Sequence, residues 1–498
     1  MSRRSAYIEE ESLYRALCAR DARFDGRLFV GVRTTGVYCR PVCPARTPRR
    51  ENVRFYPTAA AAQEAGFRPC LRCRPESAPD FGAWRGASNT VARGLALIET
   101  GALDEGDVDH LAERVGVGER QLRRLFRQHL GASPIAVAQT RRVLLAKQLL
   151  HETQLSMTEV ALASGFSSLR RFNETFRGLY GRPPSALRRD RRRGEARRPD
   201  TILTLRLPFR PPLDWQALEA HLAARAVAGV ERVSPGRYDR VVAIGEDIGV
   251  VSVAPGVGAW LDVAFDFPRL SQLPELIARV RRLFDLGADP ASIAACLSAD
   301  PDLAPRVAAR PGLRAPGAWD GFELAVRAVL GQQVSVSAAA GLASLLARRH
   351  GAPRAAGPIQ DAESLFVAFP TADRLAGADL SDLPMPRSRS RAVAALAEAA
   401  AADPALLAPG GDTARTLERL RALPGIGPWT ASYIALRALR DPDAFPAGDL
   451  GLQRALTDQD GRRPTASQLE ARSQAWRPWR AYAAQYLWTP PLAPGAGT

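Results

Sequence analysis

Four cysteines near the start of the chain have the spacing of a metal site. They form one C-x3-C pair, Cys39 and Cys43, and one C-x2-C pair, Cys70 and Cys73. Two short pairs on separate segments can supply four thiolates to a tetrahedral zinc ion, which keeps the thiols deprotonated at neutral pH. Because the first residues lack the apolar core of a signal peptide, the pattern favours a metal site over disulfides. Spacing alone leaves open whether the zinc is structural or reactive.

A second group of candidate residues lies toward the other end of the chain. The stretch LPGIGPWTA, residues 423–431, predicts a helix-hairpin-helix in which Gly425 and Gly427 permit a tight turn around Ile426. The backbone amides of such a turn can face a DNA phosphate, and hairpins of this type often bind a monovalent cation through carbonyls. A glycine-turned hairpin without function is the alternative. Asp449 follows the hairpin, and a lone Asp before a helix is usually an N-cap.

The positive charge of the chain is concentrated in its first part. The net charge is +16, and residues 1–200 hold 36 Lys+Arg against 22 Asp+Glu, whereas residues 201–498 hold 32 against 30. This distribution is expected of N-terminal domains that neutralise DNA phosphates, the alternative being a merely soluble basic surface. Lys147 is the single lysine, a bias typical of GC-rich codon usage. Because no stretch approaches 18 apolar residues, we expect a cytoplasmic, chromosome-associated protein with no membrane contact.

The periodicity of apolar residues changes along the chain. From about residue 88 to 190 they recur at three- and four-residue spacing, which predicts helices. From Thr201 the stretches TILTLRLPF, DRVVAIGED, IGVVSVAP and WLDVAFDF predict strands, with one helix at about Trp215–Ala228. After about Leu273 the chain is helical almost to its end.

Two similar helix pairs occur within the first helical part. VDHLAERVGVGERQLRRLFRQHLG and MTEVALASGFSSLRRFNETFRGLYG each predict a helix, a tight turn and a helix. The residues expected inside are Leu111, Val115, Leu122, Leu125 and Phe126, and then Val160, Ala161, Phe166, Phe172 and Phe176. The second helices expose the candidate DNA contacts Arg120, Gln121 and Arg124, and then Ser168, Arg170, Arg171 and Asn173. Taken alone, an ordinary helical bundle fits as well.

The cysteine window as a whole resembles a known regulator family. VRTTGVYCRPVCPARTPRRENVRFY, followed by GFRPCLRC, looks like the N-terminal domain of Ada-type adaptive-response regulators. The resemblance implies that Cys39 takes a methyl group from a methylated backbone phosphotriester, while Cys43, Cys70 and Cys73 are the other zinc ligands. A zinc ion with four thiolates is negatively charged and holds a nucleophilic sulfur. Methylation removes one charge that repels DNA, so binding to DNA should improve.

The two helix pairs also resemble a family. Separated by a linking helix at about Pro134–Leu150 and followed by GRPPSALRR, they look like the AraC-type regulator domain. This arrangement implies two recognition helices in successive major grooves, about 34 Å apart. Ada-type regulators have the same order of domains. Their alkylguanine methyltransferase, with its Pro-Cys-His-Arg active site, is missing, because the only cysteine after position 73 is Cys296, interpreted as a small buried apolar residue.

Residues 201 to about 490 resemble the AlkA-type 3-methyladenine DNA glycosylase II family. The resemblance rests on the hairpin, on Asp449, and on FELAVRAVLGQQVSV and WRPWRAYAAQYLW. It implies that Asp449 is catalytic, that Gln332 lies at the DNA gap, and that three aromatic residues line the base pocket: Trp429, Tyr433 and Trp488. One or two of these aromatics could instead be ordinary core residues. Gln333 departs from the family, which commonly has an apolar wedge there, so wedging by Gln333 is not predicted.

The implied reaction explains these residue types. Cleavage of the N-glycosidic bond passes through an oxocarbenium-like sugar, and a carboxylate either stabilises that cation or helps water to attack it. Alkylation at purine N3 or N7 makes the base a cationic leaving group, which aromatic faces attract. The nucleotide must be flipped out of the stack to reach Asp449.

Two absences narrow the chemistry further. Residues 201–498 contain no lysine, which lyases need for a Schiff base, and no cysteine follows position 296 that could hold an iron–sulfur cluster. A cluster-free, monofunctional glycosylase is therefore expected. The alternatives are a transcription regulator with an inactive glycosylase scaffold, and a glycosylase for another lesion. The expected partners are alkylated DNA, promoter DNA and RNA polymerase, with the protein itself a monomer.

The predicted fold is multidomain, mainly α with α+β parts. A small zinc-binding α/β domain occupies residues 1–80, and an AraC-type double helix-turn-helix occupies residues 81–190. An Arg-rich linker, 191–200, leads to the β-rich N-terminal domain of the glycosylase, 201–285. A helical domain with the helix-hairpin-helix completes the chain, 286–498.

Overall fold

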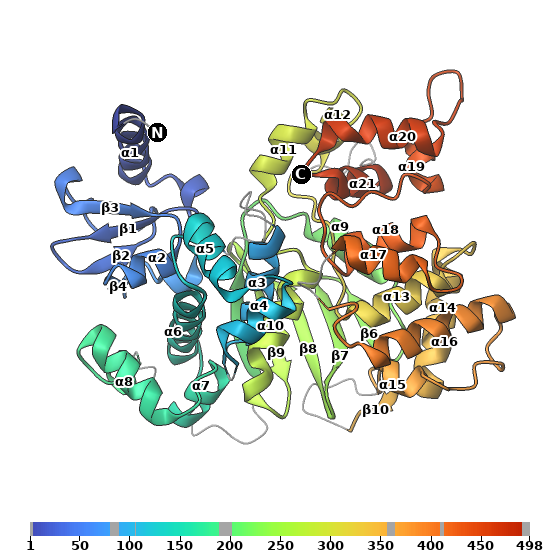
Figure 1. The fold of residues 1–498 in the computed structure, drawn as a ribbon, viewed down its shortest axis with the longest axis horizontal. Coiled ribbons are helices and arrows are strands. Elements are labelled where there is room, and N and C mark those ends of the chain that lie inside the picture. Colours follow the sequence, from blue (N-terminus) through green and yellow to red (C-terminus); the bar gives the residue numbers. More distant parts are fainter. Residues whose placement is uncertain are drawn as a thin grey trace. The chain divides into compact units, whose positions relative to one another are not determined.

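The computed structural model describes residues 3–79, 89–104, 106–188, 202–355, 364–408 and 413–490. The chain forms two compact units (Figure 1). The first comprises Met1–Asp200 and Arg269–Ala278, and the second comprises Thr201–Pro268 and Arg279–Thr498. The predicted Arg-rich linker, 191–200, lies outside the described residues. Within the described ranges, every helix is too short or too polar to cross a bilayer.

The first unit begins with a small α/β part built on a four-stranded sheet of order β3-β1-β2-β4. β1 pairs antiparallel with β2 and β3, whereas β4 runs parallel to β2. Phe29, Tyr38 and Phe67 form its core together with Ala62 and Ala78. The elements are α1 (Arg3–Cys18), β1 (Phe29–Val32), β2 (Val37–Cys39), β3 (Val53–Tyr56), α2 (Ala59–Glu64) and β4 (Arg68–Pro69).

Helices complete the first unit. They are α3 (Asn89–Glu99), α4 (Val108–Arg114), α5 (Glu119–Leu130), α6 (Pro134–Glu152), α7 (Met157–Ala163) and α8 (Leu169–Tyr180). Both predicted helix pairs are confirmed, as α4–α5 and α7–α8, and α6 is the predicted linking helix, longer by two residues. Of the ten residues predicted to lie inside, nine are buried and Leu125 is half-buried. Gly131 and Gly181 end the second helix of each pair with left-handed backbone.

The second unit contains a five-stranded antiparallel sheet of order β5-β9-β8-β7-β6 (Figure 1). Four strands were predicted, whereas β6, with the sequence ERVS, was not. The predicted helix at 215–228 ends early, at Ala223, because the chain turns into β6 and the Val227 amide donates to the Glu231 carboxylate at 3.0 Å. The elements are β5 (Leu203–Pro208), α9 (Trp215–Ala223), β6 (Glu231–Ser234), β7 (Arg237–Ile244), β8 (Asp247–Pro255) and β9 (Trp260–Asp266).

The chain after Leu273 is helical, as predicted, apart from two short strands that were not. Its first helix begins within Arg269–Ala278, the segment assigned to the first unit, and ends in the second unit. A large core cluster joins α13, α14, α16 and α18. The helices are α10 (Leu273–Leu283), α11 (Pro290–Leu297), α12 (Ala304–Ala309), α13 (Gly321–Leu330), α14 (Val336–His350), α15 (Ala372–Leu375), α16 (Arg387–Ala402), α17 (Thr413–Arg421), α18 (Pro428–Arg437), α19 (Leu450–Ala455), α20 (Ala466–Ser473) and α21 (Arg480–Trp488). The strands are β10 (Ala352–Pro353) and β11 (Val367–Ala368).

Candidate functional sites

Parallel pairing of two strands brings the cysteine pairs together. β2 and β4 run side by side with Tyr38 opposite Pro69, and the Cys70 amide donates to the Tyr38 carbonyl at 3.0 Å. Cys39 ends β2 and Cys70 follows β4, so the two neighbouring strand ends each present one sulfur. The four ligand atoms of Cys39, Cys43, Cys70 and Cys73 lie within 4.8 Å of one another. This cluster suits a tetrahedral zinc ion held by four thiolates.

Two backbone amides point at the sulfurs of the second cysteine pair. The backbone amides of Arg40 and Arg72 donate to the sulfurs of Cys73 and Cys70, each at 3.4 Å. Hydrogen bonds among the four thiols lower the pKa of Cys70 well below its ordinary value and that of Cys43 to about 7, whereas they raise the pKa of Cys39 and Cys73. A bound zinc ion would therefore be needed to keep all four deprotonated. All four cysteines are buried, so a bound zinc ion would be shielded from water.

We predict that purified, reduced protein contains one equivalent of zinc. Four clustered thiolates bind zinc tightly; the same donor set also accepts iron, and metal analysis distinguishes the two. Metal analysis of freshly purified protein checks the prediction, with chelator-treated and zinc-reloaded samples as controls. A content below about half an equivalent, not restored by added zinc, would contradict a site of this kind.

The predicted recognition surfaces lie on α5 and α8. Arg120, Gln121 and Arg124 are exposed on α5, where the Arg124 guanidinium donates to the side-chain amide oxygen of Gln121 at 2.8 Å. On α8, Arg170 and Arg171 are exposed and Asn173 is half-buried, donating to a backbone carbonyl of its own helix. Ser168, predicted as a contact, is the N-cap of α8 and accepts from the Arg171 amide. The surface residues therefore lie as a DNA-binding helix requires, and their base contacts remain predictions.

In the second unit, Asp449 is the N-cap of α19 and accepts hydrogen bonds from two indole groups. Its Oδ1 accepts from the Leu452 amide and from Trp488 Nε1, both at 2.9 Å, and its Oδ2 accepts from Trp429 Nε1 at 2.8 Å. A carboxylate with three donors is fixed in place and already engaged as an acceptor. It is therefore better suited to stabilise a positive charge than to remove a proton from water.

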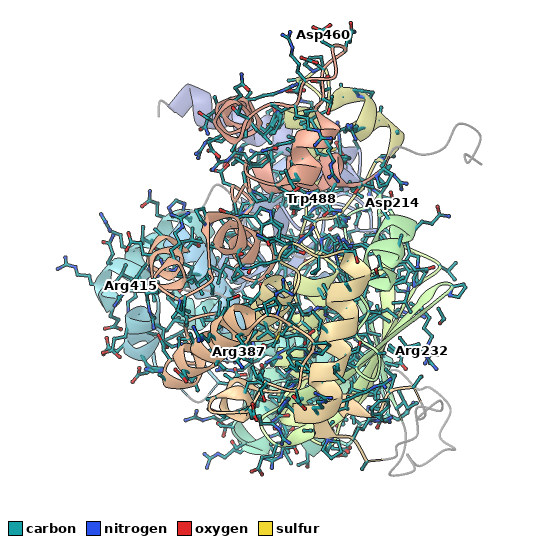
Figure 2. The ribbon with its side chains drawn as sticks, turned by 90° about the vertical axis from the view of Figure 1, so that its right-hand side faces the viewer. Asp214, Arg232, Arg387, Arg415, Asp460 and Trp488 are labelled. Atoms are coloured by element: carbon teal, nitrogen blue, oxygen red, sulfur yellow. The ribbon has the colours of Figure 1, made fainter. Side chains whose placement is uncertain are left out.

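The aromatic residues predicted for the base pocket are brought together. Trp429 and Tyr433 stack with ring centroids 5.4 Å apart, and Tyr433 meets Trp488 edge to face at 6.1 Å. All three line a cavity of about 920 Å³, which Asp449 also lines. Figure 2 shows Trp488 among the helices of the second unit, whereas Asp460 and Arg415 point outward at its edge.

A buried cation lies behind the aromatic residues. The Arg437 guanidinium lies 5.7 Å from the Tyr433 ring centroid and 5.2 Å from that of Trp488. It donates to neutral groups, the Pro316 carbonyl at 2.9 Å and the Gln485 amide oxygen at 2.7 Å. Burial lowers the pKa of Arg437 to about 10, so the side chain stays protonated at neutral pH. Burial raises the pKa of Tyr433, but the nearby positive charge of Arg437 outweighs this effect, so the pKa of Tyr433 is lowered.

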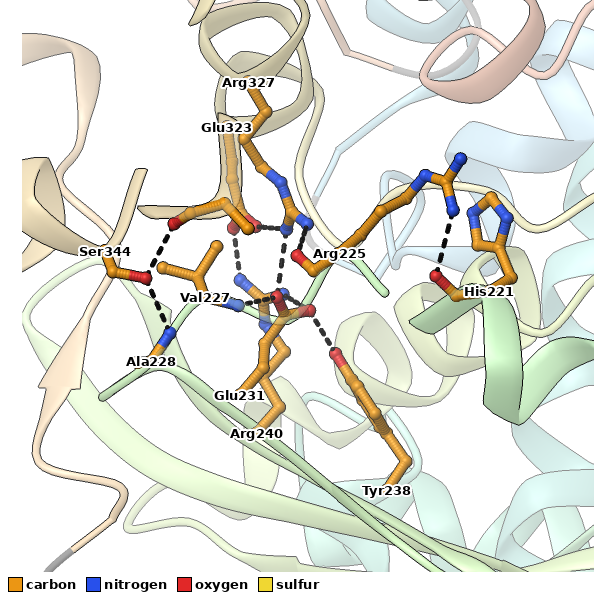
Figure 3. Close-up of polar contacts among 11 residues, drawn as sticks. His221, Arg225, Val227, Ala228, Glu231, Tyr238, Arg240, Glu323, Arg327 and Ser344 are labelled. Atoms are coloured by element: carbon orange, nitrogen blue, oxygen red, sulfur yellow. Dashed lines mark hydrogen bonds and ion pairs between the residues drawn. The ribbon is translucent and has the colours of Figure 1, made fainter. Parts of the chain in front are cut away.

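A buried ionic network forms another part of the cavity wall (Figure 3). Glu231 accepts from Tyr238, Arg240 and Arg327 at 2.7, 3.0 and 3.1 Å. Glu323 pairs with both arginines as well. Two carboxylates thus balance two guanidinium groups, which is what buried charges require. Sequence reasoning missed these residues; the i,i+4 spacing of Glu323 and Arg327 was the available signal.

The hairpin has the predicted form, although its two glycines differ. Gly425 has a φ of +77°, and an added Cβ would come within 2.7 Å of the Ala392 Cβ, so only glycine fits. Gly427, with a φ of −83°, is the N-cap of α18, a conformation open to other residues. The side chain of Ile426 is buried, so only its backbone could face DNA.

The loop between α13 and α14 carries the two glutamines predicted near DNA. Gln332 donates to the Gly425 carbonyl at 2.8 Å and to Thr430 Oγ1 at 3.0 Å, which ties this loop to the hairpin. Gln333 is exposed and has a φ of +57°. Cys296, predicted to be buried, is only half-buried, because its thiol faces the Arg477 carbonyl at 3.5 Å, at the edge of the packing.

Comparison with known proteins assigns each part. A family model described as the metal binding domain of Ada matches residues 12–76, one described as a helix-turn-helix domain matches 111–190, and the AlkA N-terminal domain matches 204–320. The chain is 45% identical over 484 residues, 96% of each chain, to a protein of Mycobacterium tuberculosis named probable bifunctional transcriptional activator/DNA repair enzyme AlkA.

Partial relatives match the two halves. DNA-3-methyladenine glycosylase 2 of Escherichia coli is 37% identical over 287 residues, 57% of this chain and 95% of that protein. The E. coli bifunctional transcriptional activator/DNA repair enzyme Ada is 34% identical over 177 residues, 35% of this chain and 48% of that protein. Among solved structures, the 3-methyladenine DNA glycosylase of Archaeoglobus fulgidus has a TM-score of 0.50 at 19% identity, over 57% of this chain and 96% of its own, which shows a shared fold.

Proposed function

The chain belongs to the family of bifunctional transcriptional activator/DNA repair enzymes named AlkA, and from this premise we propose that it senses methylated DNA backbone through Cys39 and excises alkylated bases with Asp449. The observation that carries the second part is the carboxylate of Asp449 fixed between two indoles in an aromatic cavity. The observation that carries the first is the buried cluster of four sulfurs within 4.8 Å. DNA is the common partner of both activities.

At the cysteine cluster, the proposed reaction is one methyl transfer. The Cys39 sulfur attacks the methyl carbon of a methylphosphotriester, forming an S–C bond while the C–O bond breaks and the phosphodiester anion leaves. A zinc ion bound there would keep the sulfurs deprotonated. Cys43, Cys70 and Cys73 would hold the metal. Because the product is a thioether, the acceptor turns over once.

The same step provides a switch for transcription. One negative charge disappears from a cluster that faces a polyanion, so the methylated protein binds DNA more tightly. The exposed arginines of α5 and α8 are the proposed promoter contacts, with Arg120 and Arg170 as examples. An activator of this kind is expected to contact RNA polymerase and to act as a monomer.

In the cavity, the proposed reaction is hydrolysis of an N-glycosidic bond without strand cleavage. The flipped base lies against Trp429, Tyr433 and Trp488, and Asp449 stabilises the developing oxocarbenium ion. The alkylated base leaves without strong acid catalysis, because it already carries a positive charge. Of the two roles for the carboxylate, electrostatic stabilisation is favoured by its three hydrogen-bond donors.

The test of this proposal is excision from an alkylated duplex. We expect the protein to release 3-methyladenine and to leave abasic sites that only subsequent alkali cleaves. Strand cleavage by the protein is not expected, because a β-elimination lyase needs an amine and residues 201–498 contain no lysine. Borohydride should therefore trap no covalent adduct within residues 201–498. Absence of base release from every alkylated duplex would instead favour the inactive scaffold, and release of oxidised or deaminated bases alone would favour the other lesion classes.

A further inference from the structure

We propose that Lys147, a residue of the helix-turn-helix part, is a positioning residue for the four-cysteine site. The inference rests on the proposed function only in taking that site to bind zinc and accept a methyl group. If so, α6 helps to hold the metal ligands in place, and the metal site is structurally coupled to the DNA-binding helices.

Lys147 is wholly buried and fully engaged. Its Nζ lies 2.7 Å from Glu76 Oε2 and donates to the Cys70 carbonyl at 3.1 Å. The side chains of Lys147 and Glu76 are 0% and 1% exposed. Charges at such depth are stable only when they are paired and hydrogen-bonded. The ammonium group therefore holds the backbone of a cysteine of the cluster at a fixed place on α6.

The loop that Lys147 grips carries both sulfurs of the second cysteine pair. Cys70 and Glu76 bracket Cys73, and Arg40 holds the loop from the other side. The Arg40 guanidinium donates to the Cys73 carbonyl at 3.3 Å and to Ser77 Oγ at 2.7 Å. Arg40 directly follows Cys39, the proposed methyl acceptor. Arg40 therefore connects Cys39 to the loop, and Lys147 connects the loop to α6.

Further contacts fasten the same loop to the end of α6. Arg74 lies 3.2 Å from both Glu76 and Glu152, the last residue of the helix. Another link between the small α/β part and the helices bypasses the loop: Thr58 Oγ1 donates to the Leu130 carbonyl at 2.8 Å. This link provides a control, because it joins the same parts without touching the cysteines.

The choice of lysine at this position supports a specific role. Every other cationic side chain among the 68 Lys+Arg residues is an arginine. A compact ammonium can donate to a carbonyl and a carboxylate within a small enclosed space, whereas a planar guanidinium needs a larger space. Groups that hold metal ligands in this way commonly change metal affinity when they are replaced.

The decisive variant removes both charges of the pair. K147M alone leaves the buried carboxylate of Glu76 with Arg74 as its remaining cation, whereas K147M/E76Q removes both charges of the buried pair and keeps an acceptor for Arg74. In full-length K147M/E76Q, we expect zinc affinity, measured by competition with a chelator, to fall about 10- to 100-fold. E76Q alone would leave the buried ammonium of Lys147 without a countercharge, so this single variant is expected to be destabilised and does not serve as a control. T58V, which removes the bypassing contact together with the N-cap hydroxyl of α2, should leave zinc affinity unchanged.

Wild-type zinc affinity in K147M/E76Q would overturn the proposal, because the pair would then serve only to neutralise itself. An equal fall in T58V would also overturn it, since any loosening of the two parts would have the same effect. Circular dichroism of each variant separates these results from misfolding. If the double variant does not fold, K147R is measured instead: it retains the charge, and because its larger guanidinium does not fit the closed space, it should also lower zinc affinity.

A second readout follows the switch. Each protein is methylated with a duplex that carries a methylphosphotriester, and its affinity is measured for a duplex selected from a random pool by methylated wild type. We expect methylation to tighten binding less in K147M/E76Q than in wild type and T58V. Equal tightening in all three contradicts transmission through Lys147. A wild type that takes up no methyl group contradicts the proposed function instead, while the chelator competition still decides the positioning role.

Discussion

Replacing Asp449 with Asn is expected to slow release of 3-methyladenine by about 10²- to 10³-fold, the usual loss for one preorganised electrostatic group. In the proposed reaction, the substitution removes the negative charge that would stabilise the sugar cation. It also turns one acceptor oxygen into an amide donor, which then opposes an indole N–H of Trp429 or Trp488. Stability should change little, because Asn is as good an N-cap as Asp for α19.

Single-turnover excision from an alkylated duplex measures the effect, with DNA affinity determined in parallel. Affinity should be retained, since phosphate contacts are spread over many basic groups. The matched control is Asp458→Asn, at an exposed residue outside the cavity lining that accepts from the Arg462 amide. Full activity in Asp449→Asn would refute the assignment of this carboxylate. Trp429→Phe, which keeps a ring but loses one hydrogen bond, should show a smaller loss.

Replacing Cys39 with Ala is expected to abolish methyl uptake from methylphosphotriester DNA. Three thiolates remain to hold zinc, so the variant should still fold and bind metal. The natural control is Cys18→Ala, because Cys18 is an exposed free cysteine on α1 of the same small part and lies outside the cluster. That variant should accept one methyl group like the wild type.

Peptide mass spectrometry locates the methyl group, and DNA affinity before and after the reaction measures the switch. In the wild type the methyl group should be found on Cys39 alone and binding should tighten. Transfer to Cys43, Cys70 or Cys73 would contradict the assignment of the acceptor. Methylation of Cys39 with unchanged affinity would leave the acceptor intact but disprove the electrostatic switch.

The sequence predicted those features whose determinants are local or periodic. The two cysteine pairs are local, and the helix pairs follow from apolar spacing, so both were recovered. The strand β6 was not, because Glu231 and Arg232 resemble a solvated turn until Glu231 is seen to be buried. The bonds from Trp429 and Trp488 to Asp449 span 20 and 39 residues. Only resemblance to a family, and not spacing, linked these residues before the structure did.

Lys147 illustrates what sequence could not provide. GC-rich codon usage accounts for the many arginines of the chain, but it does not explain why a lysine occurs at position 147. Its partners Glu76 and Cys70 lie 71 and 77 residues away, and no local pattern connects them. The same holds for Arg437, an ordinary helical arginine by sequence whose place behind two aromatic rings depends on how α18 and α21 pack.

The burial of this one ammonium group gives the protein a built-in chemical reporter. The chain contains no other side-chain amine for acylating reagents, and Lys147 is shielded while α6 holds the cysteine loop. Its acylation therefore requires a local opening, and the labelling rate follows the population of that opened state when closing is fast. Peptide mapping distinguishes it from the terminal amine. Labelling kinetics with and without zinc, methyl group or DNA would thus measure how firmly sensor and helices are held together, with no engineered probe.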